Sequence, residues 1–85
     1  MTRERLLDVG ALPPPEPLER ILAALDTLAA GQYLRVRHSR EPYPLYAILD
    51  EHGFDHLTRR GRDTPFEILI WRRGDDAAHA EIQRQ

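Results

Sequence analysis

Apolar residues recur at helical spacing in the first third of the chain. Between residues 16 and 30 they form one stripe, made of Leu18, Ile21, Leu22, Leu25 and Leu28. Recurrence at three- and four-residue intervals places side chains on one face of an α-helix. Pro15 and Pro17 suit the first helical turn, whose amides have no intrahelical partner, and Gly31 stands where a C-cap residue belongs. The pattern predicts a helix over residues 16–30.

Other segments carry the shorter periods of strands. Residues 5–9 are a short apolar run before Gly10, and residues 32–38 alternate between apolar and polar side chains. A short second helix is indicated by Leu45, Ile48, Leu49 and His52 on one face, ended by Gly53. Residues 54–59 and 66–72 are predicted to be strands joined by a turn at residues 61–63.

The order strand–helix–strand–helix–strand–strand predicts an α+β fold. We expect a two-layer α/β sandwich in which two helices cover one face of a four-stranded mixed sheet and leave the other face bare. Residues 1–72 form the single domain. Residues 73–85 offer a core only Ile82 and a few alanines, so we expect a frayed or disordered tail, the alternative being a terminal helical turn capped by Asp75 or Asp76.

The phase of the strands predicts which side chains the helices leave uncovered. Leu34, Val36, Phe66, Ile68 and Ile70 are expected to face the helices. The bare face would then present Tyr33, Arg35, Arg37, Leu69 and Trp71, with Trp71 at its centre. Such residues are enriched in protein interfaces. The pattern favours a protein partner, including a second copy of the chain, over single-stranded nucleic acid.

Composition excludes several kinds of chemistry. The 85 residues include no cysteine, which removes disulfides, thiolate nucleophiles and thiolate-held zinc or iron–sulfur clusters. The net charge of −2 gives no general attraction to nucleic acid. The sequence contains neither an apolar run long enough to cross a bilayer nor a signal-peptide core, so we expect a cytoplasmic protein without membrane contact.

The segment from Leu7 to Leu18 resembles the opening of the TusA/SirA-like sulfur carriers. Those proteins begin with a strand ending in Leu-Asp, followed by a Cys-Pro-x-Pro motif on the first turn of a long helix. Here Pro15, Glu16 and Pro17 match the motif, and Pro14 stands in place of the cysteine. The resemblance implies the fold of that family. Without a thiol, the sulfur-carrier activity does not carry over.

A closer resemblance is to an uncharacterised bacterial group on the same fold, DUF family 2249. It spans about residues 5–72 and rests on three short segments: Pro15-Glu16-Pro17-Leu18, the stretch from His38 through Arg40-Glu41-Pro42 to Pro44-Leu45-Tyr46, and the closing Ile70-Trp71-Arg72. This resemblance brings no established activity.

The loop between the second strand and the second helix concentrates polar chemistry. Its candidate ligand-binding residues are His38, Arg40, Glu41, Tyr43 and Tyr46. They could form a pocket for a small anion or carboxylate, with Arg40 as the bidentate partner. Alternatively, Arg40 and Glu41 pair with each other and hold the loop, while the prolines at 42 and 44 direct the second helix.

Catalysis and metal binding find less support. His52 and His56 are four residues apart, but Gly53 separates them, so they do not share a helical face. Ser39 and His38 are neighbours on a strand end and point to opposite sides. We therefore predict no catalytic residue, no metal site and no cofactor. The sequence favours a binding or interaction module without thiol chemistry, accessory to a redox or metal-handling system; the alternative is a small-anion-binding protein or an enzyme that uses the His38/Arg40/Glu41 loop.

Overall fold

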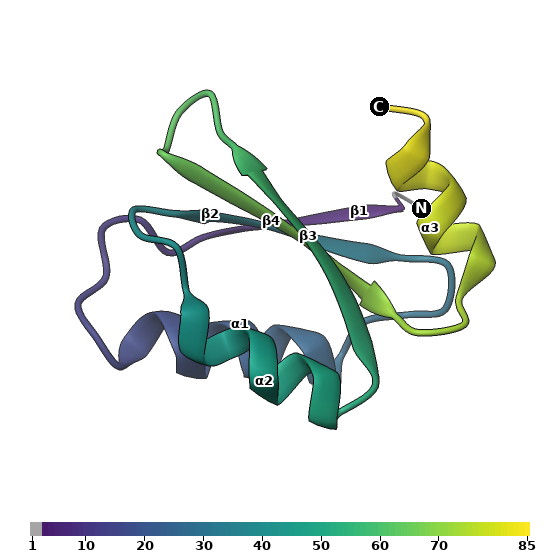
Figure 1. Ribbon diagram of the computed structural model, residues 1–85, viewed down its shortest axis with the longest axis horizontal. Helices are drawn as coiled ribbons and strands as arrows, with labels where there is room; N and C mark the ends of the chain where they lie inside the picture. The colour runs from purple at the N-terminus through teal and green to yellow at the C-terminus, as the bar shows by residue number, and fades with distance from the viewer. Residues whose placement is uncertain (1–2) are drawn as a thin grey trace.

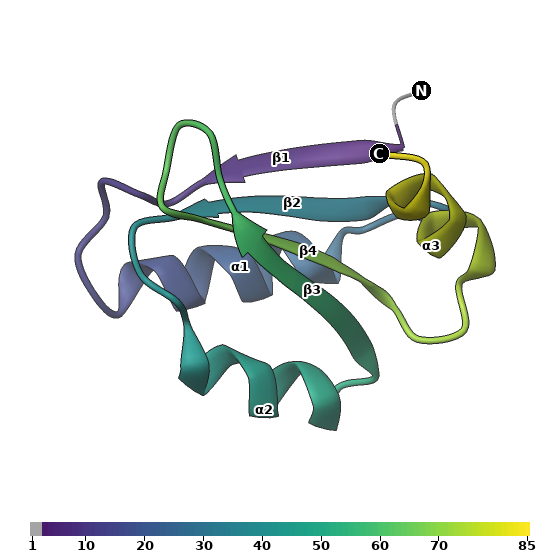
Figure 2. The same ribbon diagram turned by 45° about the horizontal axis from the view of Figure 1, so that its top comes forward.

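The computed structural model describes residues 3–85, which form one sheet and three helices. The elements follow in the order β1 (Glu4–Asp8), α1 (Glu16–Asp26), β2 (Tyr33–His38), α2 (Tyr43–Glu51), β3 (Phe54–Arg60), β4 (Phe66–Arg72) and α3 (Asp76–Gln83). The strand order is β1-β2-β4-β3, with β1 parallel to β2 and the other pairs antiparallel. Figures 1 and 2 show α1 and α2 on one side of the sheet and α3 on the other. The predicted α+β class and four-stranded mixed sheet are confirmed.

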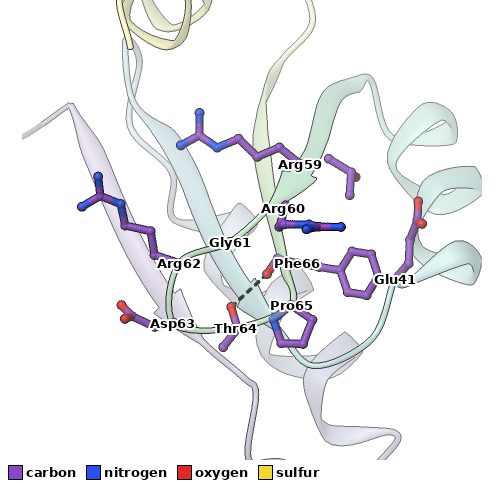
Figure 3. A pocket seen from close by; sticks show the side chains of 10 residues that line it. Glu41, Arg59, Arg60, Gly61, Arg62, Asp63, Thr64, Pro65 and Phe66 are labelled. Atoms are coloured by element: carbon purple, nitrogen blue, oxygen red, sulfur yellow. Dashed lines mark hydrogen bonds between the residues drawn. The ribbon is translucent and has the colours of Figure 1, made fainter.

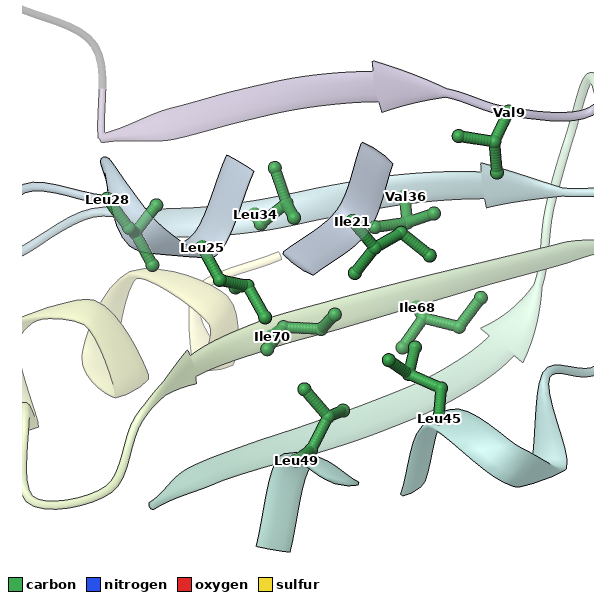
Figure 4. Packing of buried hydrophobic residues seen from close by; sticks show 10 residues of the cluster. All are labelled: Val9, Ile21, Leu25, Leu28, Leu34, Val36, Leu45, Leu49, Ile68 and Ile70. Atoms are coloured by element: carbon green, nitrogen blue, oxygen red, sulfur yellow. The ribbon is translucent and has the colours of Figure 1, made fainter. Parts of the chain in front are cut away.

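The main core lies between the sheet and the helices α1 and α2. On the sheet it uses the predicted phase of β2 and β4, because Leu34 pairs with Ile70 and Val36 pairs with Ile68 across the two strands. Figure 4 shows this cluster, whose buried members are Val9, Ile21, Leu25, Leu28, Leu34, Val36, Leu45, Leu49, Ile68 and Ile70. The core fixes both helices against the same sheet face, and it thereby positions the loops that precede them.

The C-terminal segment is ordered, so the prediction of a frayed or disordered tail at residues 73–85 is wrong. Asp75 caps α3, since its carboxylate accepts a hydrogen bond of 3.1 Å from the amide of Ala78. On the inner side of the helix, Ala78 and Ile82 are buried. The ring of His79 stacks on Trp71 with a centroid distance of 4.9 Å. Tertiary contacts with the sheet stabilise a helix that is too short to be stable alone.

Helix α3 also overturns the expectation of a bare sheet face. It forms a second buried cluster with Tyr33, Leu69 and Trp71, of which Trp71 is only 7% exposed. Arg35 and Arg37 lie on the same sheet face but are engaged in ion pairs with Glu4 and Glu67 and with Asp63, respectively. The predicted interaction surface centred on Trp71 therefore does not exist as an exposed patch.

Helix α1 ends earlier than its apolar periodicity predicts. It stops at Asp26, although Leu28 remains in the core. Carbonyls at the end of α1 and just beyond it accept hydrogen bonds from other elements: Arg5 donates to Ala24 at 3.2 Å, and Arg72 donates to Leu25 and to Leu28, which follows the helix. These side chains satisfy the helix end in place of a glycine cap. Gly31 lies in the following turn with φ of +81°.

No helix within residues 3–85 is long and apolar enough to cross a membrane.

Candidate ligand-binding site

A cavity of about 410 Å³ lies between the proline turn before α1 and the loop from β2 to α2. Its polar side chains are those of His38, Arg40 and Glu41. Apolar residues make up the rest of the wall: Pro14, Pro15, Pro17, Leu18, Ile21, Pro42, Pro44 and Leu45. The structure thus joins three of the five predicted ligand-binding residues with the proline turn that contains Pro14.

His38 enters this cavity from the sheet. Strand alternation puts it on the same face as Leu34 and Val36, and only 9% of it is exposed. Its Nδ1 accepts a hydrogen bond of 3.2 Å from the amide of Arg40, so in the neutral ring the proton resides on Nε2. Burial, with a contribution from the charge of Arg40, lowers the pKa of His38. At neutral pH the imidazole therefore offers an uncharged Nε2–H donor.

Arg40 and Glu41 do not pair with each other. Within residues 3–85 Arg40 takes part in no ion pair, whereas Glu41 accepts a hydrogen bond of 3.1 Å from the hydroxyl of Tyr46. The same hydroxyl lies 2.6 Å from that of Thr58 on β3. Because a phenol has one proton and the carboxylate can only accept, Thr58 donates to Tyr46. The contacts from Glu41 through Tyr46 to Thr58 hold the loop and leave the guanidinium of Arg40 available to a ligand.

The two tyrosines of the predicted site support the loop and are not part of the cavity wall. Tyr46 stacks on His56 with a centroid distance of 4.2 Å, and burial raises the pKa of Tyr46, so its hydroxyl stays protonated. Tyr43 is 69% exposed and meets the ring of Tyr46 edge-on at 6.1 Å. Tyr46 is thus a positioning residue, and Tyr43 lies on the surface beside it.

A second cavity of about 660 Å³ adjoins the first, and Glu41 lines both. It is built by the hairpin between β3 and β4, where a side chain on Gly61 would come within 2.4 Å of the carbonyl of Thr64. Figure 3 shows Arg60 extending over Phe66 on the side of Glu41, while Arg62 extends to the opposite side of the hairpin. Arg60 takes part in no ion pair among residues 3–85.

The sequence interpretation missed Arg60. In the sheet, Arg60 pairs with Phe66 and Phe66 pairs with His38, so the three residues form one row across the end of the helix-covered face. Extending the period-two alternation through residues 54–60 would have placed Arg60 on that face.

The remaining histidines do not gather into a metal site. Within the described residues 3–85, no group of three or more histidine or acidic side chains is arranged to hold a metal ion. His56 stacks on Tyr46 and His79 stacks on Trp71, on opposite faces of the sheet. What the site offers is non-covalent: a guanidinium, an imidazole N–H and a carboxylate at the rim of an apolar cavity.

Comparisons with known proteins identify a family. No curated protein and no solved structure matches the chain, so the likeness to the TusA/SirA sulfur carriers stays a prediction. A family model described as "Uncharacterized conserved protein (DUF2249)" matches residues 6–72. The matched region includes both cavities and ends at the last residue of β4, before α3. The chain therefore belongs to the DUF2249 family of uncharacterized conserved proteins.

Proposed function

We propose that this chain is a non-catalytic, cytosolic binding module whose small-molecule ligand occupies the proline-lined cavity. The observation that carries the proposal is that His38 and Arg40, each with an unused donor, line the same apolar cavity. Ligand pockets are typically concave and apolar, with a few polar groups that orient the ligand. This cavity has that composition.

The wall chemistry indicates a ligand with an apolar body and a carboxylate. A guanidinium binds a carboxylate through two parallel N–H donors, and the Nε2–H of His38 supplies another. The prolines of the wall have fixed φ angles, so they lose little conformational freedom when a ligand binds. Apolar carboxylic acids are therefore the ligand class that fits the cavity best.

A covalent sulfur-carrier role has no support in this site. Pro14, at the position of the family-like cysteine, contributes to the cavity wall, and the chain contains no cysteine. We infer that a non-covalent ligand replaces the covalent sulfur of the carriers that the sequence resembles. A protein partner and an accessory role in a redox or metal-handling system remain predictions from the sequence.

A thermal unfolding screen tests the proposal. Isocaproate, an apolar carboxylate, should raise the melting temperature, and inorganic phosphate and sulfate should not. A ligand at about 100 times its Kd stabilises a protein by about 2.7 kcal/mol. Arg40→Gln should remove this stabilisation and change the unliganded protein by no more than about 0.5 kcal/mol, because Arg40 is exposed and unpaired.

Arg20→Gln is the matched control, because Arg20 is an exposed arginine of α1 outside both cavities. It should leave the response to isocaproate unchanged. A response that is absent in the natural sequence, or equal in the Arg40→Gln and Arg20→Gln variants, would contradict the proposed function.

A further inference from the structure

Glu41 is a half-buried carboxylate without a cationic partner. It lies at the junction of the two cavities and lines both. Its carboxylate accepts a hydrogen bond from the neutral hydroxyl of Tyr46 and also interacts with the hydroxyl of the exposed Tyr43, whose pKa it raises, but no ion pair within residues 3–85 includes it. A carboxylate withdrawn from water is costly unless a cation or several donors compensate it. Glu41 therefore has unused capacity for a positively charged group.

Two other acidic side chains at this end of the sheet, Glu67 and Asp63, form ion pairs with arginines of the protein itself. Glu67, which is almost fully buried, binds Arg35 at 2.9 Å and Arg59 at 3.1 Å. Although burial opposes ionisation, these two arginines hold the pKa of Glu67 below its usual value. Asp63 binds Arg37 at 3.3 Å. Glu41 differs from these two carboxylates, because no ion pair within residues 3–85 includes it.

The group beside Glu41 in the chain is Arg40, which also lacks an ion-pair partner among residues 3–85. One negative and one positive side chain, adjacent in sequence and unpaired with each other, thus line the same apolar cavity. Opposite charges held apart in this way suit a ligand that carries both charges a short distance from each other. An α-amino acid has that arrangement, with its ammonium and carboxylate on one carbon.

Building on the proposed function, we propose that the ligand is an α-amino acid with an apolar side chain. Its ammonium binds Glu41, its carboxylate binds Arg40 and the Nε2–H of His38, and its side chain lies against the prolines of the cavity. The hydrogen bonds that run from Glu41 through Tyr46 to Thr58 orient the carboxylate of Glu41 before the ligand binds. Recognition of both charges distinguishes an amino acid from a simple carboxylic acid.

Isothermal titration calorimetry with three ligands of one shape tests the inference. Leucine carries both charges, isocaproate lacks the ammonium and isoamylamine lacks the carboxylate. Leucine should bind at least about tenfold more tightly than either analogue, a difference of about 1.4 kcal/mol, because each analogue lacks one of the two charged contacts. The comparison needs no variant, so it does not depend on whether a mutant folds.

Variants then test whether the ammonium of leucine binds Glu41. Glu41→Gln keeps an oxygen acceptor for Tyr46 and removes the charge, so it should lower the affinity for leucine to about that for isocaproate, and it should not weaken the binding of isocaproate, which has no ammonium. Arg60→Gln removes the guanidinium of the other unpaired arginine beside Glu41 and should leave the affinity for leucine unchanged. A loss in Arg60→Gln as large as that in Arg40→Gln would place the ligand in the larger cavity and overturn the assignment.

The outcomes separate this inference from the proposed function. If isocaproate binds as tightly as leucine and Glu41→Gln changes neither affinity, the amino-acid inference is wrong and the carboxylate site stands. If neither leucine nor isocaproate binds, both proposals fail.

Discussion

Among the polar residues of the candidate site, His38 is the one whose burial, hydrogen bonding and protonation are set by its place in the fold. Its place at the end of β2 buries it, and the amide of Arg40 occupies its Nδ1. Both burial and the nearby guanidinium disfavour the protonated ring, so the pKa of His38 in the folded state lies below the ordinary value of 6.5. The unfolded chain therefore takes up a proton at a higher pH than the folded chain does.

This difference predicts a pH dependence of stability. The contribution of His38 is fully present above about pH 6.5 and is lost as the pH falls through the lower pKa of the folded state. Urea unfolding at about pH 7.5 and about pH 5 measures the change in the free energy of unfolding. His38→Gln should reduce that change, whereas His52→Gln, at an exposed position, should not. Equal changes in the two variants would show that His38 is not responsible.

Single residues of the site were only partly accessible to sequence interpretation. The loop residues His38, Arg40 and Glu41 were found because polar groups concentrate in the segment between the second strand and the second helix. The sequence could not decide whether Arg40 forms an ion pair with Glu41. The answer depends on the hydrogen bond that Glu41 accepts from Tyr46, whose hydroxyl also bonds to Thr58 on a different element. Competition among hydrogen-bond partners is a property of the folded chain.

At the level of elements, the periodicity of apolar residues predicts those helices and strands that pack one regular face against the main core. The strand at residues 66–72 and the start of the long helix at Glu16 were predicted correctly. Helix α3 was not, because its sequence has few apolar positions and its buried side chains, Ala78 and Ile82, pack against residues of strands that are distant in sequence. The end of α1 was also predicted wrongly, because arginines from β1 and β4 donate hydrogen bonds to its last carbonyls.

The packing of α3 can be tested with Ile82→Ala. Ile82 is 6% exposed and lies in the cluster with Trp71, so truncation should cost about 2 kcal/mol of unfolding free energy and shift the tryptophan emission toward the red. Gln83→Ala, at an exposed position of the same helix, is the matched control. Fluorescence-detected urea unfolding measures both effects. Unchanged emission and stability in Ile82→Ala would mean that α3 does not cover Trp71.

For the molecule as a whole, the arrangement of strands explains where the cavities lie. The parallel strands β1 and β2 both lead at their carboxyl ends into loops that precede α1 and α2. Loops at the carboxyl ends of parallel strands commonly form binding sites in open sheets. The β3–β4 hairpin reaches the same end of the sheet, and Figure 2 shows these three connections gathered there, away from α3. The fold thus separates the end of the sheet that carries both cavities from the end near which α3 packs.

Mapping a carboxylate ligand onto the isotope-labelled protein by NMR tests the central claim most directly. Titration with isocaproate should shift backbone amide signals around the proline-lined cavity, at Leu18, His38, Arg40 and Leu45. The signals of α3 should stay in place, because that helix lies on the opposite face of the sheet (Figure 1). Absence of any shift at millimolar ligand, or shifts confined to the β3–β4 hairpin or to α3, would contradict the assignment of this cavity as the ligand-binding site.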